Sequence, residues 1–198
     1  MGGIMGYDEN DKETLINLLK TKDNIISELK NKIDELTYFA DFDCMTGVYN
    51  RRYGLKLLHN FIETSRHEEK IHTTVSFIDV DKLKRVNDNY GHDEGDKLLI
   101  VISDVLKKSV RKDDIVFRLG GDEFIIIFPH TSLKQAKKIE KRIWDNIEEV
   151  NNSNKFKFKL QISSGFCEFS SSDANSIEEL IKKADSNMYK QKNERAFL

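Results

Sequence analysis

The fold is decided by Ile115-Val-Phe-Arg-Leu-Gly-Gly-Asp-Glu-Phe-Ile-Ile-Ile-Phe128, near the middle of a chain of 198 residues. Two short runs rich in β-branched and aromatic residues, Ile115–Leu119 and Glu123–Phe128, flank the pair Gly120-Gly121. Because both glycines accept a positive φ, this pattern predicts a β-hairpin closed by a type I′ turn.

Strand and helix patterns alternate on either side of the hairpin. Two capping boxes, Ser132-x-x-Gln135 and Ser176-x-x-Glu179, each open a predicted helix. The other predicted elements are a helix from Asn50 to about Arg66, a strand over Ile71–Val80, a polar turn at Asn87–Gly91, a helix over roughly 93–109 and a strand over Phe156–Phe169.

From residue 71 the predicted order is therefore β-α-β-β-α-β, followed by a last helix. This is the split βαβ or ferredoxin-like plan of an α+β domain, in which helices pack on an antiparallel sheet. The same plan forms the palm of many nucleotide-polymerising enzymes, but a fold alone assigns no function.

Residues 8–38 contain neither glycine nor proline and repeat apolar residues at alternating steps of three and four, with Lys22 as the polar seam position. The spacing is that of a coiled coil over about three heptads, and an amphipathic helix packed on its own domain is the alternative. The polar residues outside the narrow stripe favour a parallel dimeric coiled coil. We therefore divide the chain into a coiled-coil helix, 1–38, and a second domain, 39–198, which holds the hairpin. The stripe consists of Leu15, Leu19, Ile26, Leu29, Ile33 and Leu36.

The composition sets limits on partners and location. Hydrophobic residues make up 38% of the chain, and 32 basic against 34 acidic residues leave a net charge of −2, so no overall field attracts nucleic acid. Cys44 and Cys167 lie outside any metal-binding pattern and are expected as free thiols. No apolar run approaches the ~18 residues of a membrane span, and the N-terminus does not resemble a signal peptide. We expect a cytoplasmic protein, or the cytoplasmic part of a larger sensor whose sensor or receiver domain lies upstream.

Acidic residues gather at two points that this topology brings together. Asp79 and Asp81 end the strand before the hairpin, and Asp122 and Glu123 follow the paired glycines. Carboxylates on neighbouring strands, about 4.8 Å apart, can share one cation, and hard oxygen ligands suit Mg²⁺. The alternative is that these acids are solvated residues beside turns.

The segment from Lys84 to Asp96 is dense in hydrogen-bonding groups. Asn87 and Asp96 could bind a purine edge, because a carboxylate accepts the N1–H and amine donors of guanine, a pair that adenine lacks. The alternative is an Asx-rich loop that leads into the following helix. The residues alone thus support a nucleotide-binding palm enzyme that uses Mg²⁺.

Three motifs resemble one family. Arg118-Leu-Gly-Gly-Asp-Glu-Phe124 resembles the signature of the GGDEF family, the diguanylate cyclases, in unmodified form. Asp43-Cys-Met-Thr-Gly-Val-Tyr-Asn-Arg-Arg52 resembles its D-x-L-T-G-L-x-N-R-R motif, with Met45 and Val48 in place of leucines. The block from Phe77 to Asp96 resembles D-x-D-x-F-K-x-x-N-D-x-x-G-H-x-x-G-D, with Leu83 for phenylalanine. The resemblance covers about residues 40–192.

The resemblance implies an enzyme that condenses two GTP molecules into cyclic di-GMP and releases two pyrophosphates, working as a homodimer because each domain holds one GTP. By motif position, Asp79, Asp122 and the carbonyl oxygen of Val80 would ligate Mg²⁺, with Mn²⁺ as an alternative. Asp122 would also be the base for the ribose 3′-OH. Glu123 would support the metal site, and Lys84 would stabilise charge on the phosphates.

The same comparison assigns substrate contacts. Asn87 and Asp96 would hold guanine, His92 would lie close to the substrate, and Gly120 and Gly121 would let the backbone approach the phosphates.

Arg111-Lys-Asp-Asp114 matches the R-x-x-D inhibitory site of the family, where Arg111 and Asp114 would bind the product. A salt pair within a turn is the alternative. The family pattern A-K-x-x-G-R is altered at the C-terminus: Lys192 is retained as a phosphate ligand, but the glycine is missing and Arg195 lies one position early.

Two other functions compete with catalysis. One is a non-catalytic module that binds cyclic di-GMP or GTP and signals through the coiled coil, and the retained signature acids argue against it. The other is a related cyclase that uses ATP in part, which Asp96 at the guanine-reading position disfavours.

Overall fold

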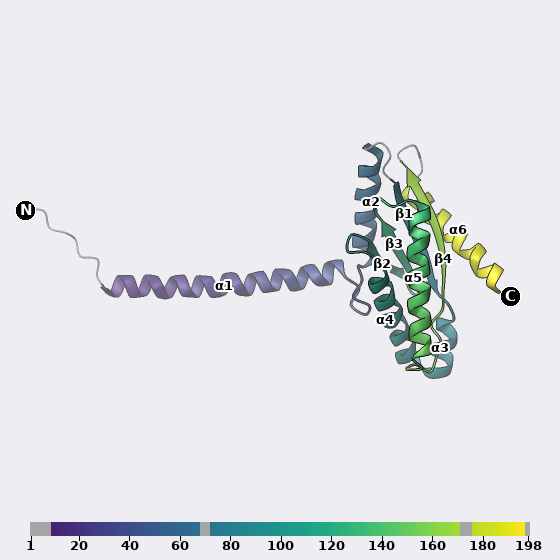
Figure 1. Ribbon diagram of the computed structural model, residues 1–198. Helices are drawn as coiled ribbons and strands as arrows, with labels where there is room; N and C mark the ends of the chain where they lie inside the picture. The colour runs from purple at the N-terminus through teal and green to yellow at the C-terminus, as the bar shows by residue number, and fades with distance from the viewer. Residues whose placement is uncertain (1–8, 68–71, 171–175, 197–198) are drawn as a thin grey trace, which may run out of the picture. The chain divides into compact units, whose positions relative to one another are not determined.

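The computed structural model describes residues 9–67, 72–170 and 176–196 (Figure 1). The chain forms two compact units, one that ends at Ala40 and one that begins at Asp41, and each is described by itself. None of the helices in these ranges combines the length and the apolar character that crossing a bilayer requires. Cys44 is a free thiol, and the Sγ of Cys167 donates to the carbonyl of Glu168 at 3.8 Å.

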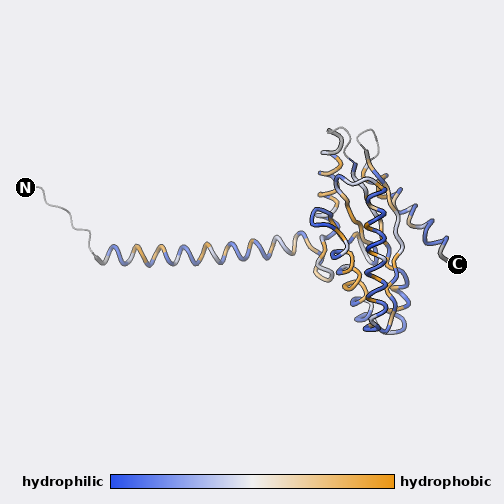
Figure 2. The backbone as a smooth tube through the Cα atoms, in the orientation of Figure 1, coloured by the Kyte–Doolittle hydropathy of each residue, from blue (hydrophilic) through white to orange (hydrophobic). Residues whose placement is uncertain are grey.

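The described part of the first unit is a single helix, α1 (Glu9–Asp41), whose last residue begins the second unit, and hydrophobic and hydrophilic residues alternate along it (Figure 2). Every side chain of the predicted stripe is exposed by 49% or more. A seam this narrow is buried only when it pairs with another helix. The N-terminal helix is thus confirmed, and its pairing with a second copy stays a prediction.

The second unit is built on a four-stranded sheet with the order β2-β3-β1-β4, in which every neighbouring pair is antiparallel. This order confirms the ferredoxin-like plan. The strands are β1 (His72–Val80), β2 (Ile115–Gly120), β3 (Glu123–Phe128) and β4 (Ile162–Ser170). The helices are α2 (Arg51–His67), α3 (Leu83–Tyr90), α4 (His92–Ser109), α5 (Leu133–Asn152) and α6 (Ile177–Ala196). Ile71, the predicted first residue of β1, lies outside the described residues.

Strand β3 shows how the sheet is buried on both faces. Phe124, Ile126 and Phe128 pack into a cluster with α4 and α5, and Ile125 and Ile127 pack into a second cluster with α2 and α6. Successive side chains of a strand point to opposite faces. A strand covered by helices on both faces therefore needs a continuous apolar sequence, without alternating polar residues.

Both predicted capping boxes are present. The Ser132 backbone N–H donates to Gln135 Oε1 at 2.9 Å at the start of α5. Before α6, the backbone N–H of Glu179 donates to Ser176 Oγ, and that of Ser176 donates to Glu179 Oε2, each at 3.2 Å. These bonds satisfy N–H groups that a helix start leaves without partners.

The predicted turn at Asn87–Gly91 is wrong for all but its last residue, because α3 extends from Leu83 to Tyr90. Val86 is buried one turn after Leu83, so even this polar segment has a short apolar face. The helix ends at Gly91, whose φ of 90° suits glycine.

The strand predicted over Phe156–Phe169 begins only at Ile162. Upstream, the Asn151 side chain takes both backbone groups of Leu160: its Oδ1 accepts the N–H at 2.7 Å and its Nδ2 donates to the carbonyl at 2.9 Å. The carbonyl of Gln161 accepts the N–H of Asp81 at 2.9 Å. These bonds occupy groups that a strand ladder would use, so the segment is an ordered loop.

The hairpin is present, but its turn differs from the predicted type I′ turn. Gly120 pairs with Glu123, so Gly121 and Asp122 form the loop, and of these two only Gly121 has a positive φ, 41°. A bulge between Arg118 and Gly120 accompanies the turn.

Candidate active site

The sheet brings the two acidic pairs together at one end. Asp79, at the end of β1, lies directly opposite Glu123, the first residue of β3. The backbone N–H of Val80 donates to the carbonyl of Asp122 at 2.9 Å, which fixes the turn against β1. Directly opposed residues point to the same face of a sheet, so Asp79 and Glu123 share one surface.

Lys192, on α6, is bound to the acids of β1. Its Nζ lies 2.5 Å from Asp79 Oδ1 and 3.2 Å from Asp81 Oδ1. Asp81 is only 7% exposed and also accepts from Ser163 Oγ at 3.0 Å. Burial lowers the pKa of Lys192, but the hydrogen bonds and charges of Asp79 and Asp81 outweigh burial and leave the pKa above its ordinary value. The predicted phosphate ligand is therefore a counter-ion of the acids in this structure.

Glu123 lies in a field of negative charge. Burial raises its pKa most, and the carboxylates of Asp122, Asp185 and Asp79 raise it further, while Arg51 partly offsets them. Sequence reasoning did not identify Asp185, which α6 places near the site, or Arg51 at the start of α2. No local signal marked Asp185, because its approach depends on how α6 packs on the sheet.

The corner formed by Asp79, Asp81, Asp122 and Glu123 fits a cation, since an ammonium group lies between two of its carboxylates. Within the described ranges, no three His, Cys, Asp or Glu side chains converge closely enough to hold a metal by themselves. A divalent ion here would need backbone and ligand oxygens to complete its shell, which is how Mg²⁺ usually binds in nucleotide sites.

Arg118, on β2, holds the turn between β2 and β3. Its Nη2 and Nε donate to the carbonyl of Gly121 at 2.7 and 3.0 Å, and its Nη1 lies 3.3 Å from Asp43 Oδ1. Asp43 also accepts from Thr46, at 2.7 Å from the hydroxyl and 2.9 Å from the backbone N–H. Burial raises the pKa of Asp43, but the bonds from Thr46 and Arg118 outweigh it and lower the pKa. Two of the family motifs thus meet through Arg118.

The turn itself is open. A Cβ added at Gly121 would meet no atom within 4 Å, and one at Gly120 would approach only Glu123 Oε2, at 4.0 Å. The backbone of both predicted substrate-contacting glycines is therefore accessible to a ligand.

Helices α3 and α4 carry the other predicted substrate residues. Lys84, His92 and Asp96 are exposed. Asn87 is half-buried, and its Oδ1 is buried with no hydrogen-bond partner. A Cβ at Gly95 would lie 1.8 Å from this oxygen, so a larger residue at position 95 would force the Asn87 amide to move. A buried acceptor without a partner is costly in a native fold, and such atoms occur at functional positions.

Arg111 and Asp114 lie away from this corner, on the turn between α4 and β2. The backbone N–H of Arg111 donates to Asp114 Oδ2 at 2.7 Å, and no side-chain ion pair joins the two among the described residues. Burial raises the pKa of Asp114 despite the nearby charges of Arg111 and Arg142. Both line a pocket of about 260 Å³, which Phe42, Tyr49, Lys107 and Lys112 also line.

The family profile "Diguanylate cyclase, GGDEF domain" matches residues 40–196. The chain belongs to the GGDEF diguanylate cyclase family. Diguanylate cyclase DgcM of Escherichia coli K12 is 32% identical over 175 residues, which cover 85% of this chain and 40% of that protein. The chain thus spans about two fifths of the length of this relative.

Two solved GGDEF structures share the fold. Diguanylate cyclase SiaD of Pseudomonas aeruginosa, crystallised with its activator SiaC, is 26% identical with a TM-score of 0.73, over 94% of this chain and 71% of SiaD. The coiled coil and GGDEF domain of DgcB from Caulobacter crescentus, in complex with c-di-GMP, gives 21% identity and a TM-score of 0.78, over 91% and 95%. The second likeness concerns the fold alone, and it extends to the long N-terminal helix of this GGDEF protein.

Proposed function

We propose that this GGDEF domain condenses two GTP molecules into cyclic di-GMP with release of two pyrophosphates. The observation that carries the proposal is the pairing of Asp79 with Glu123, and of Val80 with Asp122, at one open corner. An unmodified signature in this geometry supports catalysis over a purely binding role.

Asp122 is the residue that we assign as general base. Its place in a two-residue turn lets its carboxylate approach a ribose 3′-OH bound over the hairpin. Lys84, exposed on α3, would stabilise negative charge on the phosphates as the 3′-oxygen attacks the α-phosphorus of the second GTP and pyrophosphate leaves. Glu123 would add negative charge to the site at which the metal ion of GTP binds.

Asp79, Asp122 and the Val80 carbonyl would hold Mg²⁺, or Mn²⁺, and this ion would polarise the phosphates of GTP. For Asp79 to become a ligand, its bond to Lys192 has to be exchanged, and the released ammonium can then contact a phosphate oxygen. Lys192 would thus alternate between two partners. Arg195 lies in α6, but its side chain lies outside the described residues.

Guanine would be bound between α3 and α4. The Asn87 Oδ1 is an acceptor that a guanine N–H can satisfy, and Asp96, exposed near the start of α4, can accept two further donors. His92 lies on the same exposed side of the start of α4.

The active form would be a homodimer, because two GTP-loaded domains have to face each other. The exposed stripe of α1 supports pairing through a parallel coiled coil, which raises the effective concentration of one domain for the other into about the millimolar range. We also propose that an upstream sensor or receiver domain acts through α1 and that the protein works in the cytoplasm, where GTP is available.

The pocket around Arg111 and Asp114 would bind the product and reduce activity. Its charged and aromatic lining suits a ligand with phosphates and flat rings. The alternative function, a module that binds cyclic di-GMP or GTP without catalysis, would use the same pocket.

One assay tests these proposals together. The protein is incubated with GTP and either Mg²⁺ or Mn²⁺, and the products are separated by chromatography. Cyclic di-GMP should form only with the metal, and added product should inhibit the parent more strongly than the variant Arg111→Ala. With Leu29→Glu and Ile33→Glu combined, specific activity should rise with protein concentration. Absence of cyclic di-GMP, with GTP still bound, would favour the non-catalytic module.

A further inference from the structure

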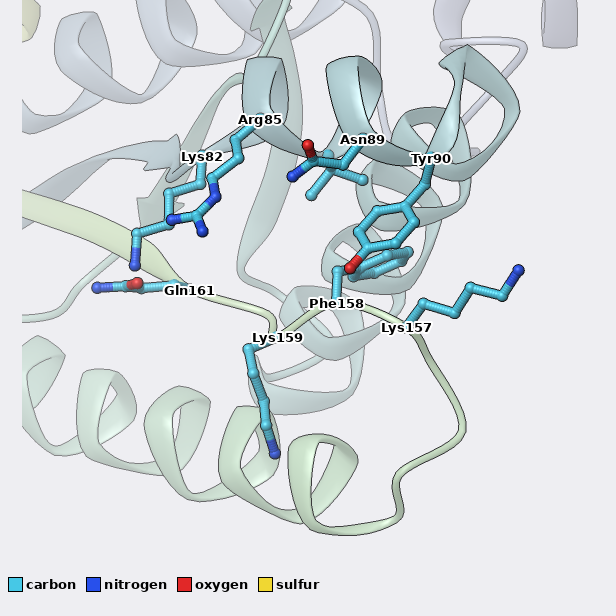
Figure 3. A pocket seen from close by; sticks show the side chains of 9 residues that line it. Lys82, Arg85, Asn89, Tyr90, Lys157, Phe158, Lys159 and Gln161 are labelled. Atoms are coloured by element: carbon cyan, nitrogen blue, oxygen red, sulfur yellow. The ribbon is translucent and has the colours of Figure 1, made fainter.

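A second pocket, of about 260 Å³, lies between α3 and the loop that leads into β4 (Figure 3). At about 100° of rotation per residue, Arg85 and Asn89 share one face of α3, whereas Lys84 and Asn87 lie on the opposite face. The pocket is thus separated by the body of α3 from the proposed substrate residues. It also shares no residue with the pocket around Arg111.

The lining of this pocket is strongly basic. It includes four Lys or Arg residues and no Asp or Glu, in a chain whose net charge is −2. Three other lysines of the domain, Lys97, Lys107 and Lys137, have acidic partners one turn away, for example Lys97 with Glu94 at 2.7 Å. Among the described residues, neither Lys82 nor Arg85 forms an ion pair. Cations gathered around a hollow without a counter-charge attract an anionic ligand.

The two ends of the pocket differ in character. In Figure 3 the side chains of Lys82 and Arg85 extend side by side toward Gln161, whereas Tyr90 projects over Phe158 at the other end. Phe158 is 7% exposed, but Tyr90 is 45% exposed and leaves much of its ring accessible. Asn89 lies between the two ends. A cationic end and an aromatic end, with amides beside them, suit a flat ring linked to a phosphate.

The two remaining lysines have other positions. Lys159 donates to the carbonyl of Asn151 at 3.0 Å, and its side chain points toward α5, away from Lys82. Lys157 extends outward from the loop. The phosphate-binding end is therefore formed by the pair on the α3 side, and the loop lysines contribute a wider positive field.

We propose that this pocket binds a nucleoside monophosphate. The phosphate lies between Lys82 and Arg85, the base lies against Tyr90, and the amides of Asn89 and Gln161 hydrogen-bond the base or the ribose. The volume falls just below the ~300–1,000 Å³ typical of small-molecule sites, which suits a ligand of the size of one nucleotide. This site is independent of the proposed function.

The test is isothermal titration of the full chain with AMP, chosen because the proposed substrate face selects guanine. The parent should bind one AMP per chain. Arg85→Glu should weaken binding at least tenfold, and Tyr90→Ala should weaken it about fivefold. Lys138→Glu, which reverses an exposed charge on α5 outside the pocket, should change the affinity less than twofold. Inorganic phosphate should bind at least tenfold more weakly than AMP and should not respond to Tyr90→Ala.

Several outcomes would overturn the proposal. These are no saturable AMP binding, equal affinity in Arg85→Glu and the parent, or phosphate that binds as tightly as AMP. Loss of AMP binding in Asp96→Ser, with Arg85→Glu unaffected, would place the nucleotide on the substrate face instead. Circular dichroism and melting curves establish that each variant is folded, and Arg85→Gln replaces Arg85→Glu if the charge reversal unfolds the domain.

Discussion

The two ends of the proposed active site differ in how their polar groups are satisfied. At the acidic corner, the carboxylates of Asp79 and Asp81 are already bound to the ammonium of Lys192. On α3, the Oδ1 of Asn87 is buried without any partner. If the proposed roles hold, the acidic corner would have to break an internal ion pair before it accepts a cation, whereas the α3 end would gain a hydrogen bond on guanine binding and break none.

This difference separates two costs of substrate binding. Breaking the Lys192 ion pair would oppose metal binding. The unpaired acceptor on α3, by contrast, already destabilises the ligand-free protein, so binding would remove that penalty. Variants at each end should consequently change different measurable quantities: metal-dependent stability at the corner and nucleotide affinity on α3.

The largest effect is expected at Asp122. Asp122→Ala removes the proposed base and one metal ligand, so cyclic di-GMP formation should fall by about 10³-fold or more while the fold remains. Product chromatography and a melting curve measure the two quantities. Asp145→Ala, at an exposed position on α5, is the control and should keep full activity. Substantial turnover in a folded Asp122→Ala protein would reject the assignment.

The next effect concerns the internal ion pair. Lys192→Gln leaves Asp81, which is buried, without its cation, and should lower the free energy of unfolding by roughly 1–3 kcal/mol in the absence of metal. Added Mg²⁺ should then raise the melting temperature of the variant more than that of the parent, because no ammonium competes. Equal Mg²⁺ shifts in both proteins would show that Lys192 does not oppose the metal.

The same ion pair has a defined pH dependence. The folded protein raises the pKa of Lys192 above its ordinary value of 10.5, so the stabilisation is complete below that value and disappears as the pH rises through the folded pKa. The stability difference between Lys192→Gln and the parent should therefore be constant from pH 7 to 9 and shrink only in stronger base.

A smaller effect is expected on α3. Gly95→Ala places a methyl group where the Asn87 oxygen lies, so the amide has to move and the affinity for a non-hydrolysable GTP analogue should fall about tenfold. Lys97→Ala, at an exposed position of α4 two residues after Gly95, should leave the affinity within twofold. Unchanged binding in Gly95→Ala would mean that Asn87 does not contact guanine.

The smallest effect concerns Glu123. Its raised pKa means that the folded state favours the protonated form, so the group stabilises the fold in acid and loses that contribution as the pH rises through the folded pKa. Glu123→Gln should then melt about 1 °C above the parent at pH 7 and equally at pH 4. Glu149→Gln, exposed on α5, should show no such difference.

Local patterns predicted the parts of the fold that depend on neighbouring residues. The two apolar runs around Gly120 predicted β2 and β3, and pairing of adjacent strands placed Asp79 near Glu123. The patterns failed where a side chain from another segment forms hydrogen bonds with the backbone. Asn151 binds both groups of Leu160, and no periodicity of the segment could reveal that bond.

The sequence predicted that the acids at the ends of two strands lie close together, but it did not predict the basic residues that pair with acids in the fold. Lys192 and Asp79 are separated by 113 positions, and Arg118 and Asp43 by 75, so only the packed fold brings these charges together. The family motifs predicted that Lys192 binds a phosphate. Without a ligand, Lys192 pairs with Asp79 and Asp81. Helix α3 was missed because its single buried residue, Val86, gave too weak a period.

The contact between Arg118 and Asp43 limits where a foreign domain can be fused to this protein. Arg118 binds both the loop after α1, through Asp43, and the turn between β2 and β3, through Gly121, and Asp41 is also bound to Arg52 at 3.1 Å. A chimera that fuses a foreign sensor to this domain should therefore keep every residue from Asp41 onward and place its junction within α1. A junction between Asp41 and Thr46 would remove contacts that hold the turn between β2 and β3. An inactive chimera could then have lost either its response to the sensor or its enzymatic activity, and the two could not be told apart.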